Sequence, residues 1–223
     1  MQKILAGVRQ FRTEEYPRQR ELFEQLARKQ QNPKALFITC ADSRVHPNLI
    51  TMTEPGDLFL IRNAGNIIPP NGQIGGGEAA TIEYSVEVLG IQHIIVCGHS
   101  QCGAMQALLT GRALDELPAA RAFFAHAEST RRIVQQKYRD KNLTPKDLLM
   151  AATEENVLVQ LSNLSTHPCV AARLASGEIS LYGWYYDIAS GAILQFDQNC
   201  GQFVELDGQP QATAAMPVRS IAV

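Results

Sequence analysis

The sequence has no strong excess of charge of either sign. Its 20 Lys and Arg residues stand against 22 Asp and Glu residues, which gives a formal net charge of −2 and a pI near 6.2. A chain this close to neutral has no long-range field to attract nucleic acid or an anionic membrane surface. We therefore expect a small substrate, with neither nucleic acid nor a membrane as a partner.

Long apolar runs are also missing. The apolar stretches are far shorter than the roughly 20 residues that cross a bilayer as a helix. The N-terminal residues spread Lys3, Arg9 and Arg12 among polar side chains, and they lack the apolar core and small-residue cleavage site of a signal peptide. The sequence therefore predicts a cytoplasmic protein.

Cysteine is scarce, with five residues in 223, and the number is odd. In a reducing compartment such cysteines are metal ligands, nucleophiles or core residues more often than disulfide partners. The chain also lacks internal repeats and any linker-like segment. With 45% hydrophobic residues it can bury a core without disulfides, so we predict one domain over residues 1–223, with an N-terminal helical arm over 1–32 and a loosely held tail from about 208 to 223.

Short apolar runs alternate with segments of helical periodicity. The run at 35–39 is almost wholly apolar, as is 93–97, and this pattern is typical of strands buried on both faces. Alternation of strands and helices predicts an α/β fold whose central, mostly parallel sheet is flanked by helices. The other expected elements are a strand at 57–62, helices at 14–30, 78–89, from 103, 119–137 and 154–174, and a C-terminal hairpin that joins 179–187 to 192–197.

Soft metal ligands follow two of the expected strands. Cys40 ends one strand, and His99 and Cys102 follow another. Because ligands of an open α/β sheet bind outside the carboxyl ends of its strands, we expect these three side chains to meet. Two thiolates and one imidazole suit zinc and leave its fourth position for water. Each residue alone fits a simpler role, as a buried small side chain or a helix-cap histidine, but the three together favour a metal site.

Two motifs carry a resemblance to a known family. The segments Cys40-Ala41-Asp42-Ser43-Arg44 and His99-Ser100-Gln101-Cys102-Gly103 match the Cys-x-Asp-x-Arg and His-x-x-Cys-Gly motifs of the β-carbonic anhydrases. The sequence resembles this family from the N-terminal helix to about the C-terminal hairpin. Further stretches that look like its bacterial and plant members are 54–57, 62–66 and 83–84.

The resemblance implies a zinc enzyme that reversibly hydrates carbon dioxide to bicarbonate and a proton. By it, Cys40, His99 and Cys102 bind one Zn²⁺ per subunit, and Asp42 and Arg44 form a catalytic dyad beside the metal. Zinc lowers the pKa of a bound water from ~15.7 toward ~7, and the resulting hydroxide attacks carbon dioxide. The family has an open state and a closed state in which the aspartate is the fourth zinc ligand, so we expect Asp42 to switch between these roles and higher pH to favour the open state.

The resemblance also assigns a substrate pocket. Gln31 matches a glutamine that donates to the substrate, the backbone of Gly103 matches part of the same pocket, and Tyr84 matches an aromatic of its wall. The alternatives are a solvated helix-end residue for Gln31 and a core tyrosine for Tyr84. In this family the cleft lies near a dimer interface, so Gln31 could serve the partner's zinc. The helix at 14–30 is expected to pack across the neighbouring subunit in a homodimer or a larger homo-oligomer such as a tetramer.

Several residues depart from the family pattern or have no assigned role. Some members have a non-catalytic bicarbonate site built on a tryptophan and a glycine where this chain has Phe37 and Thr39, so we expect no such site and a simple bicarbonate and pH dependence. Arg62 is expected to serve the subunit interface or the Arg-Asn turn. His46 is either a proton carrier or a surface histidine, and Cys97 fits core packing. Cys169 and Cys200 show no pattern that assigns a role.

Two other functions stay open at this level. A zinc hydroxide could attack a related small electrophile such as carbon disulfide, and the fold could be a non-enzymatic zinc-binding scaffold. The pair of Asp42 and Arg44 argues against the scaffold, because a structural zinc needs no acid and guanidinium beside it. The physiological role, whether bicarbonate supply, cyanate metabolism or pH balance, does not follow from the sequence.

Overall fold

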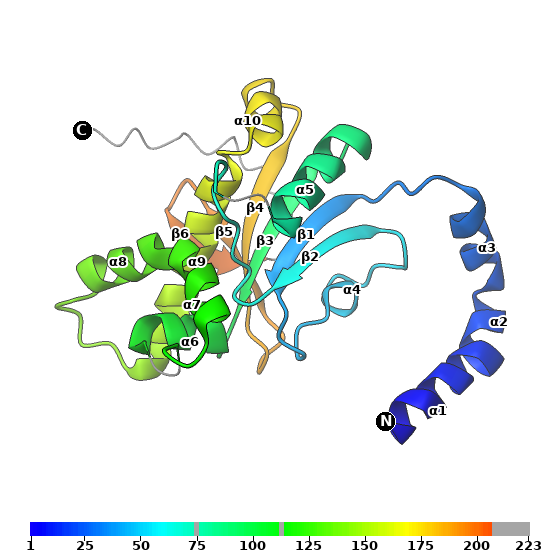
Figure 1. The fold of residues 1–223 in the computed structure, drawn as a ribbon, viewed down its shortest axis with the longest axis horizontal. Coiled ribbons are helices and arrows are strands. Elements are labelled where there is room, and N and C mark those ends of the chain that lie inside the picture. Colours follow the sequence, from blue (N-terminus) through cyan, green and yellow to red (C-terminus); the bar gives the residue numbers. More distant parts are fainter. Residues whose placement is uncertain (74–75, 112–113, 207–223) are drawn as a thin grey trace. The chain divides into compact units, whose positions relative to one another are not determined.

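The computed structural model describes residues 1–73, 76–111 and 114–206 (Figure 1). The expected tail from about residue 208 lies outside these residues. The chain divides into two compact units, one over Met1–Asn32 and one from Pro33 onward. Each unit is described by itself below.

The first unit is helical from residue 2, earlier than the start at 14 that the sequence predicts. It comprises α1 (Gln2–Gln10), the π-helical η1 (Phe11–Glu15), the short α2 (Tyr16–Arg18) and α3 (Arg20–Arg28). Pro17 has no N–H to donate to the carbonyl four residues earlier, which interrupts the α-helical hydrogen bonds. The π-helical residues of η1 lie directly before this interruption. Several large apolar side chains of this unit are exposed, namely Ile4, Leu5, Val8, Phe11 and Leu26.

The second unit is built on one six-stranded sheet in the order β2-β1-β3-β4-β5-β6. Its first four strands are parallel to one another, and the last two pair antiparallel. The predicted mostly parallel sheet and the C-terminal hairpin are confirmed, while the sixth strand was not predicted. The strands are β1 (Ala35–Cys40), β2 (Leu58–Asn63), β3 (His93–His99), β4 (Ser180–Tyr186), β5 (Ile193–Asp197) and β6 (Gln202–Glu205).

The central strands are buried on both faces, as their apolar sequences require. All six residues of β1 are buried, and so are the last six of the seven residues of β3. Leu36, Ile38 and Val96 contribute to the larger core on one face, while Phe37 and Cys97 pack with Trp184 on the other. The confirmed burial of Cys97 agrees with its expected role in core packing.

Helices cover the sheet, and α6, α7, α8 and α9 are gathered together at one side of it (Figure 1). The predicted single helix at 154–174 is wrong. The structure has α9 (Pro145–Leu164) and then α10 (Pro168–Ala175), because Pro168 offers no N–H to continue α9 and instead begins a new helix. The remaining helices are α4 (Pro47–Ile50), α5 (Gly77–Glu83), the π-helical η2 (Tyr84–Val88), α6 (Gly103–Thr110), α7 (Pro118–Phe124), the 3₁₀ turn η3 (Ala125–Ala127) and α8 (Glu128–Lys137).

The long helix α9 lies directly against the strand that ends at His99. A Cβ atom on Gly98 would lie 2.8 Å from Cγ2 of Thr153 and 3.0 Å from Cγ2 of Val157. Glycine is therefore required for this close approach of helix and strand. No helix within the described residues is long and apolar enough to cross a membrane.

Candidate metal centre

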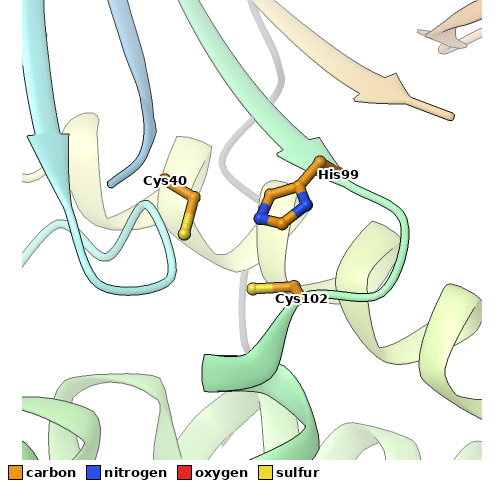
Figure 2. Close-up of side chains that lie close together, drawn as sticks. All are labelled: Cys40, His99 and Cys102. Carbon is orange, nitrogen blue, oxygen red and sulfur yellow. The ribbon is translucent and has the colours of Figure 1, made fainter. Parts of the chain in front are cut away.

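Three side chains from two separate segments of the sequence converge at the carboxyl end of the parallel sheet (Figure 2). Cys40 is the last residue of β1, His99 is the last residue of β3, and Cys102 is the N-cap of α6. Their ligand atoms all lie within 4.8 Å of one another, and all three residues are buried. The structure thus brings together the three side chains that the sequence predicts as metal ligands.

The ring of His99 is held so that one nitrogen faces the two sulfurs. Its Nδ1 lies 2.9 Å from the carbonyl oxygen of Ser100, an acceptor that requires the proton on Nδ1. The ring is completely buried, and within the described part of the chain its Nε2 has no hydrogen-bond partner. A buried nitrogen without a partner costs about 1–3 kcal/mol, and a metal ion that accepts its lone pair removes this cost.

The two thiols are buried next to each other and shift each other's pKa. The Cys102 thiol, and to a smaller extent His99 and the N–H of Gly65, which lies 3.4 Å from Sγ of Cys40, lower the pKa of Cys40 and outweigh the effect of burial. The neighbouring Cys40 sulfur and burial raise the pKa of Cys102 above its usual range. A divalent cation offsets the repulsion between two thiolates and releases their protons. Two sulfurs and one imidazole nitrogen are a donor set that fits Zn²⁺ and leaves a fourth position.

Asp42 and Arg44 form a two-pronged ion pair at the edge of this cluster. Arg44 Nε donates to Oδ1 of Asp42 at 3.0 Å and Nη2 donates to Oδ2 at 2.8 Å, while the Arg44 N–H donates to Oδ1 at 3.0 Å. These contacts hold the pKa of Asp42 well below its usual range. Oδ2 of Asp42 lies 3.9 Å from Nε2 of His99, so the carboxylate faces the unpartnered nitrogen.

Gln101 supports the far side of Arg44, a contact that sequence reasoning missed. Arg44 Nη1 donates to Oε1 of Gln101 at 3.3 Å, and Nη2 donates to its carbonyl oxygen at 3.2 Å. Gln101 has a φ of 56°, in the left-handed region, which turns its carbonyl toward the guanidinium. The only signal in the sequence was its place between His99 and Cys102.

Arg62 holds the backbone from which Cys40 and Asp42 project. Its Nε and Nη2 donate to the carbonyl of Cys40 at 3.2 and 3.0 Å, and Nη2 also donates to the carbonyl of Asp42 at 2.8 Å. The sequence suggested the Arg-Asn turn or a subunit interface for this residue. Its neighbour Asn63 binds the same loop, because its carbonyl accepts from the N–H of Ala41 at 2.8 Å.

The expected substrate residues occupy different environments. Gly103 is the first residue of α6, directly after Cys102. Tyr84 is 44% exposed and stacks on Phe59 with ring centroids 6.2 Å apart. Gln31 belongs to the first unit and is exposed. Its position relative to the metal centre stays a prediction, as do the roles of Gly103 and Tyr84.

The side chains of His46 and Thr39, which the sequence also singles out, bond to backbone groups and not to the three predicted metal ligands. His46 caps α4, where its Nδ1 accepts from the N–H of Leu49 at 3.3 Å. Thr39 is buried and donates to the carbonyl of Cys97 at 2.9 Å. Cys169 is partly buried and Cys200 is exposed, and all five cysteines are free thiols.

Comparisons with known proteins agree with this geometry. The family model described as "Carbonic anhydrase" matches residues 35–193. A carbonic anhydrase of Synechococcus elongatus is 47% identical over 211 residues, which are 94% of this chain and 76% of that protein. The solved structure of the β-carbonic anhydrase CcaA is 48% identical, with a TM-score of 0.91, and the match covers 96% of this chain and 94% of that one.

More distant relatives share the fold as well. One of two tetrameric β-carbonic anhydrases from the filamentous ascomycete Sordaria macrospora is 26% identical, with a TM-score of 0.75, over 92% of this chain and 96% of that one. The matched family model covers the strands that end at Cys40 and His99 and the turn to α6. The chain therefore belongs to the carbonic anhydrase family and, within it, to the β class.

Proposed function

We propose that this chain catalyses the reversible hydration of carbon dioxide to bicarbonate and a proton, with one Zn²⁺ per subunit held by Cys40, His99 and Cys102. The observation that carries the proposal is the buried cluster of two sulfurs and one unpartnered nitrogen, with the ionised Asp42 3.9 Å from that nitrogen. Family membership supports the same activity.

Zinc, when bound, supplies a Lewis acid that makes water a nucleophile near neutral pH. The chain's own residues supply orientation. Asp42 accepts a hydrogen bond from the reacting water, which leaves a lone pair directed at the carbon of carbon dioxide. Arg44 keeps the carboxylate ionised and fixed through two parallel hydrogen bonds, a geometry that is stronger and more specific than a single contact.

The same pair sets the two states expected of Asp42. While Arg44 binds both carboxylate oxygens, Asp42 stays off the metal position, which corresponds to the open state. If Asp42 leaves Arg44, its carboxylate can become the fourth ligand, which corresponds to the closed state. Crystal structures over a range of pH test this switch, and Asp42 paired with Arg44 at every pH, together with unchanged activity, would contradict it.

We propose that Gln31 and the backbone of Gly103 bind the substrate and that Tyr84 lines the pocket. Exposed apolar side chains of the first unit, among them Val8 and Phe11, support a homodimer or a larger homo-oligomer in which this unit packs on a neighbouring subunit. The tetrameric relatives support a tetramer. Residues 1–223 are proposed to act as one domain with a helical arm. Free thiols throughout the chain support a cytoplasmic location.

Stopped-flow measurement of carbon dioxide hydration on purified protein of known zinc content tests the proposal. The wild type should hydrate carbon dioxide. Asp42→Ala should keep its zinc and lose most activity, whereas Cys102→Ala should lose both. Fully loaded wild-type enzyme without hydration activity would refute the proposal, and the same sample assayed with carbon disulfide would then distinguish the related hydrolase from a zinc-binding scaffold.

A further inference from the structure

A row of amide side chains on α9 binds the loop that follows β2. Asn156, Gln160 and Asn163 are spaced at four and three residues and therefore lie on one face of the helix. Asn156 Nδ2 donates to the carbonyl of Gly65 at 3.0 Å. Gln160 Oε1 accepts from the N–H of Ile68 at 2.8 Å, and Asn163 Nδ2 donates to the carbonyl of Ile68 at 2.9 Å. We call these three side chains the amide row.

The orientation of Asn156 is fixed from the opposite side. Its Oδ1 accepts from Nε2 of Gln160 at 2.9 Å and from the hydroxyl of Thr130 at 3.2 Å. Asn156, Gln160 and Thr130 are all completely buried. With two donors on the oxygen, the amide nitrogen of Asn156 must face Gly65, so this hydrogen bond is pre-organised.

Gly65 connects the amide row to a ligand of the metal centre. Its carbonyl accepts from Asn156, and its N–H donates to Sγ of Cys40 at 3.4 Å. Its φ is +82°, and a Cβ atom would lie 3.0 Å from Cβ of Ala104 and 3.1 Å from Cε of Met105. The backbone of Gly65 therefore adopts a left-handed conformation and packs closely against α6. The hydrogen bond from Asn156 fixes the direction of its carbonyl.

We propose that Asn156 is a positioning residue for the Cys40 ligand, acting through Gly65. By holding the carbonyl of Gly65, it keeps the N–H of the same residue on the Cys40 sulfur. A hydrogen bond to a metal-bound sulfur orients it and lowers the energy of its lone pairs, and loss of such an outer contact typically lowers metal affinity by about 10- to 100-fold. This inference rests on the proposed zinc site and deepens it.

The test compares Asn156→Ala with Asn163→Ala. Asn163 is a matched control because it too donates to a carbonyl of the same loop, yet it does not bind Gly65. Zinc affinity is measured by competition with a chelator, and the sulfur-to-metal charge-transfer band is recorded after Co²⁺ replaces zinc. Thermal unfolding of each metal-free protein reports the purely structural effect.

We expect Asn156→Ala to weaken zinc binding by about 10- to 100-fold and to move the charge-transfer band to longer wavelength, because an unbonded sulfur gives up its electron more readily. Asn163→Ala should leave both quantities at the wild-type value. The inference is wrong if Asn156→Ala changes only thermal stability, or if the two variants shift affinity and band equally.

A second measurement does not depend on a stable variant. In wild-type protein loaded with ¹¹³Cd, the amide proton of Gly65 should show scalar coupling to the metal through the Cys40 sulfur, and its absence would refute the hydrogen bond. The two proposals fail differently. Wild type that binds no zinc refutes the proposed function, whereas wild type that binds zinc and hydrates carbon dioxide, with no difference between Asn156→Ala and the control, refutes only the role of Asn156.

Discussion

Replacing Gly98 by alanine puts a methyl group into the contact between β3 and α9. The new carbon would lie 2.8 Å from Cγ2 of Thr153 and 3.0 Å from Cγ2 of Val157. Carbon atoms pack best at about 3.5–4.0 Å, so helix and strand would have to separate by several tenths of an ångström. Because His99 is the next residue of β3, this separation also displaces a proposed ligand of the metal centre.

Overpacking of this kind costs about 1–3 kcal/mol of folding free energy. In a domain of this size, each kcal/mol corresponds to about 2–4 °C in Tm. We therefore expect Gly98→Ala to lower Tm by about 2–12 °C and to reduce both zinc affinity and carbon dioxide hydration. Gly77→Ala is the matched control, since a Cβ atom at this exposed first residue of α5 contacts no described residue within 4 Å.

A double-mutant cycle tests the physical cause. Thr153→Ser removes the methyl group that the new carbon meets and keeps the hydroxyl that donates to the carbonyl of Leu149 at 2.8 Å. The combination with Gly98→Ala should recover about 0.5–3 kcal/mol relative to the sum of the single effects. Additive effects of the two substitutions, or a Gly98→Ala protein as stable as the Gly77→Ala control, would refute the reasoning.

Three further predictions follow from ionisable residues of the second unit. Arg62→Ala removes the donors to the carbonyls of Cys40 and Asp42, so kcat/KM should fall by about 10- to 100-fold, which stopped-flow hydration measures; activity at the wild-type level would contradict the role of Arg62. Arg131 and Arg132 lower the pKa of Glu128 to about 2. The stabilisation of the folded state by this carboxylate is therefore present above the unfolded pKa of ~4.3 and is lost as pH falls toward ~2. Glu128→Gln should lower Tm slightly at neutral pH, less in high salt, and progressively less as the solution is acidified, and a pH-independent difference would refute the assignment. Burial, with a neighbouring carboxylate, raises the pKa of Glu154 to about 7, so the folded chain retains a proton that the unfolded chain loses and stability falls as pH rises from ~4.3 to ~7. Thermal unfolding of Glu154→Gln should therefore show a higher Tm than wild type above about pH 7 and no such gain near pH 4, and a gain that does not change with pH would contradict the prediction.

The central strands and the ligand set could be predicted because local patterns specify them. The runs that end at Cys40 and His99 are short and apolar, which is typical of strands buried on both faces. The ends of parallel strands share one edge, which is why residues nearly 60 positions apart could be expected at one site. Pro168 also indicates the end of one helix and the start of the next, but helical periodicity on both sides of it hides the boundary between α9 and α10.

The supporting contacts could not be predicted, since they join residues that no local pattern connects. Arg62 reaches the carbonyl of Cys40 because β1 and β2 pair in one particular register, with Cys40 opposite Asn63. The left-handed turn at Gln101 directs a carbonyl at Arg44. Both contacts depend on backbone geometry that exists only in the assembled sheet and turn.

The sequence by itself determined which atoms could hold a metal, since residue type fixes the chemistry of sulfur, imidazole and carboxylate. Only the tertiary structure decided how these atoms are held. Burial, together with the acceptor on Nδ1, leaves Nε2 of His99 without a hydrogen-bond partner among the described residues. The N–H of Gly65 donates to the Cys40 sulfur, and Asn156 of α9 donates to the carbonyl of the same residue in the loop after β2. Hydrogen bonds are directional and short, so they form only where helices and strands pack in one particular arrangement. The type of a residue alone does not specify that arrangement.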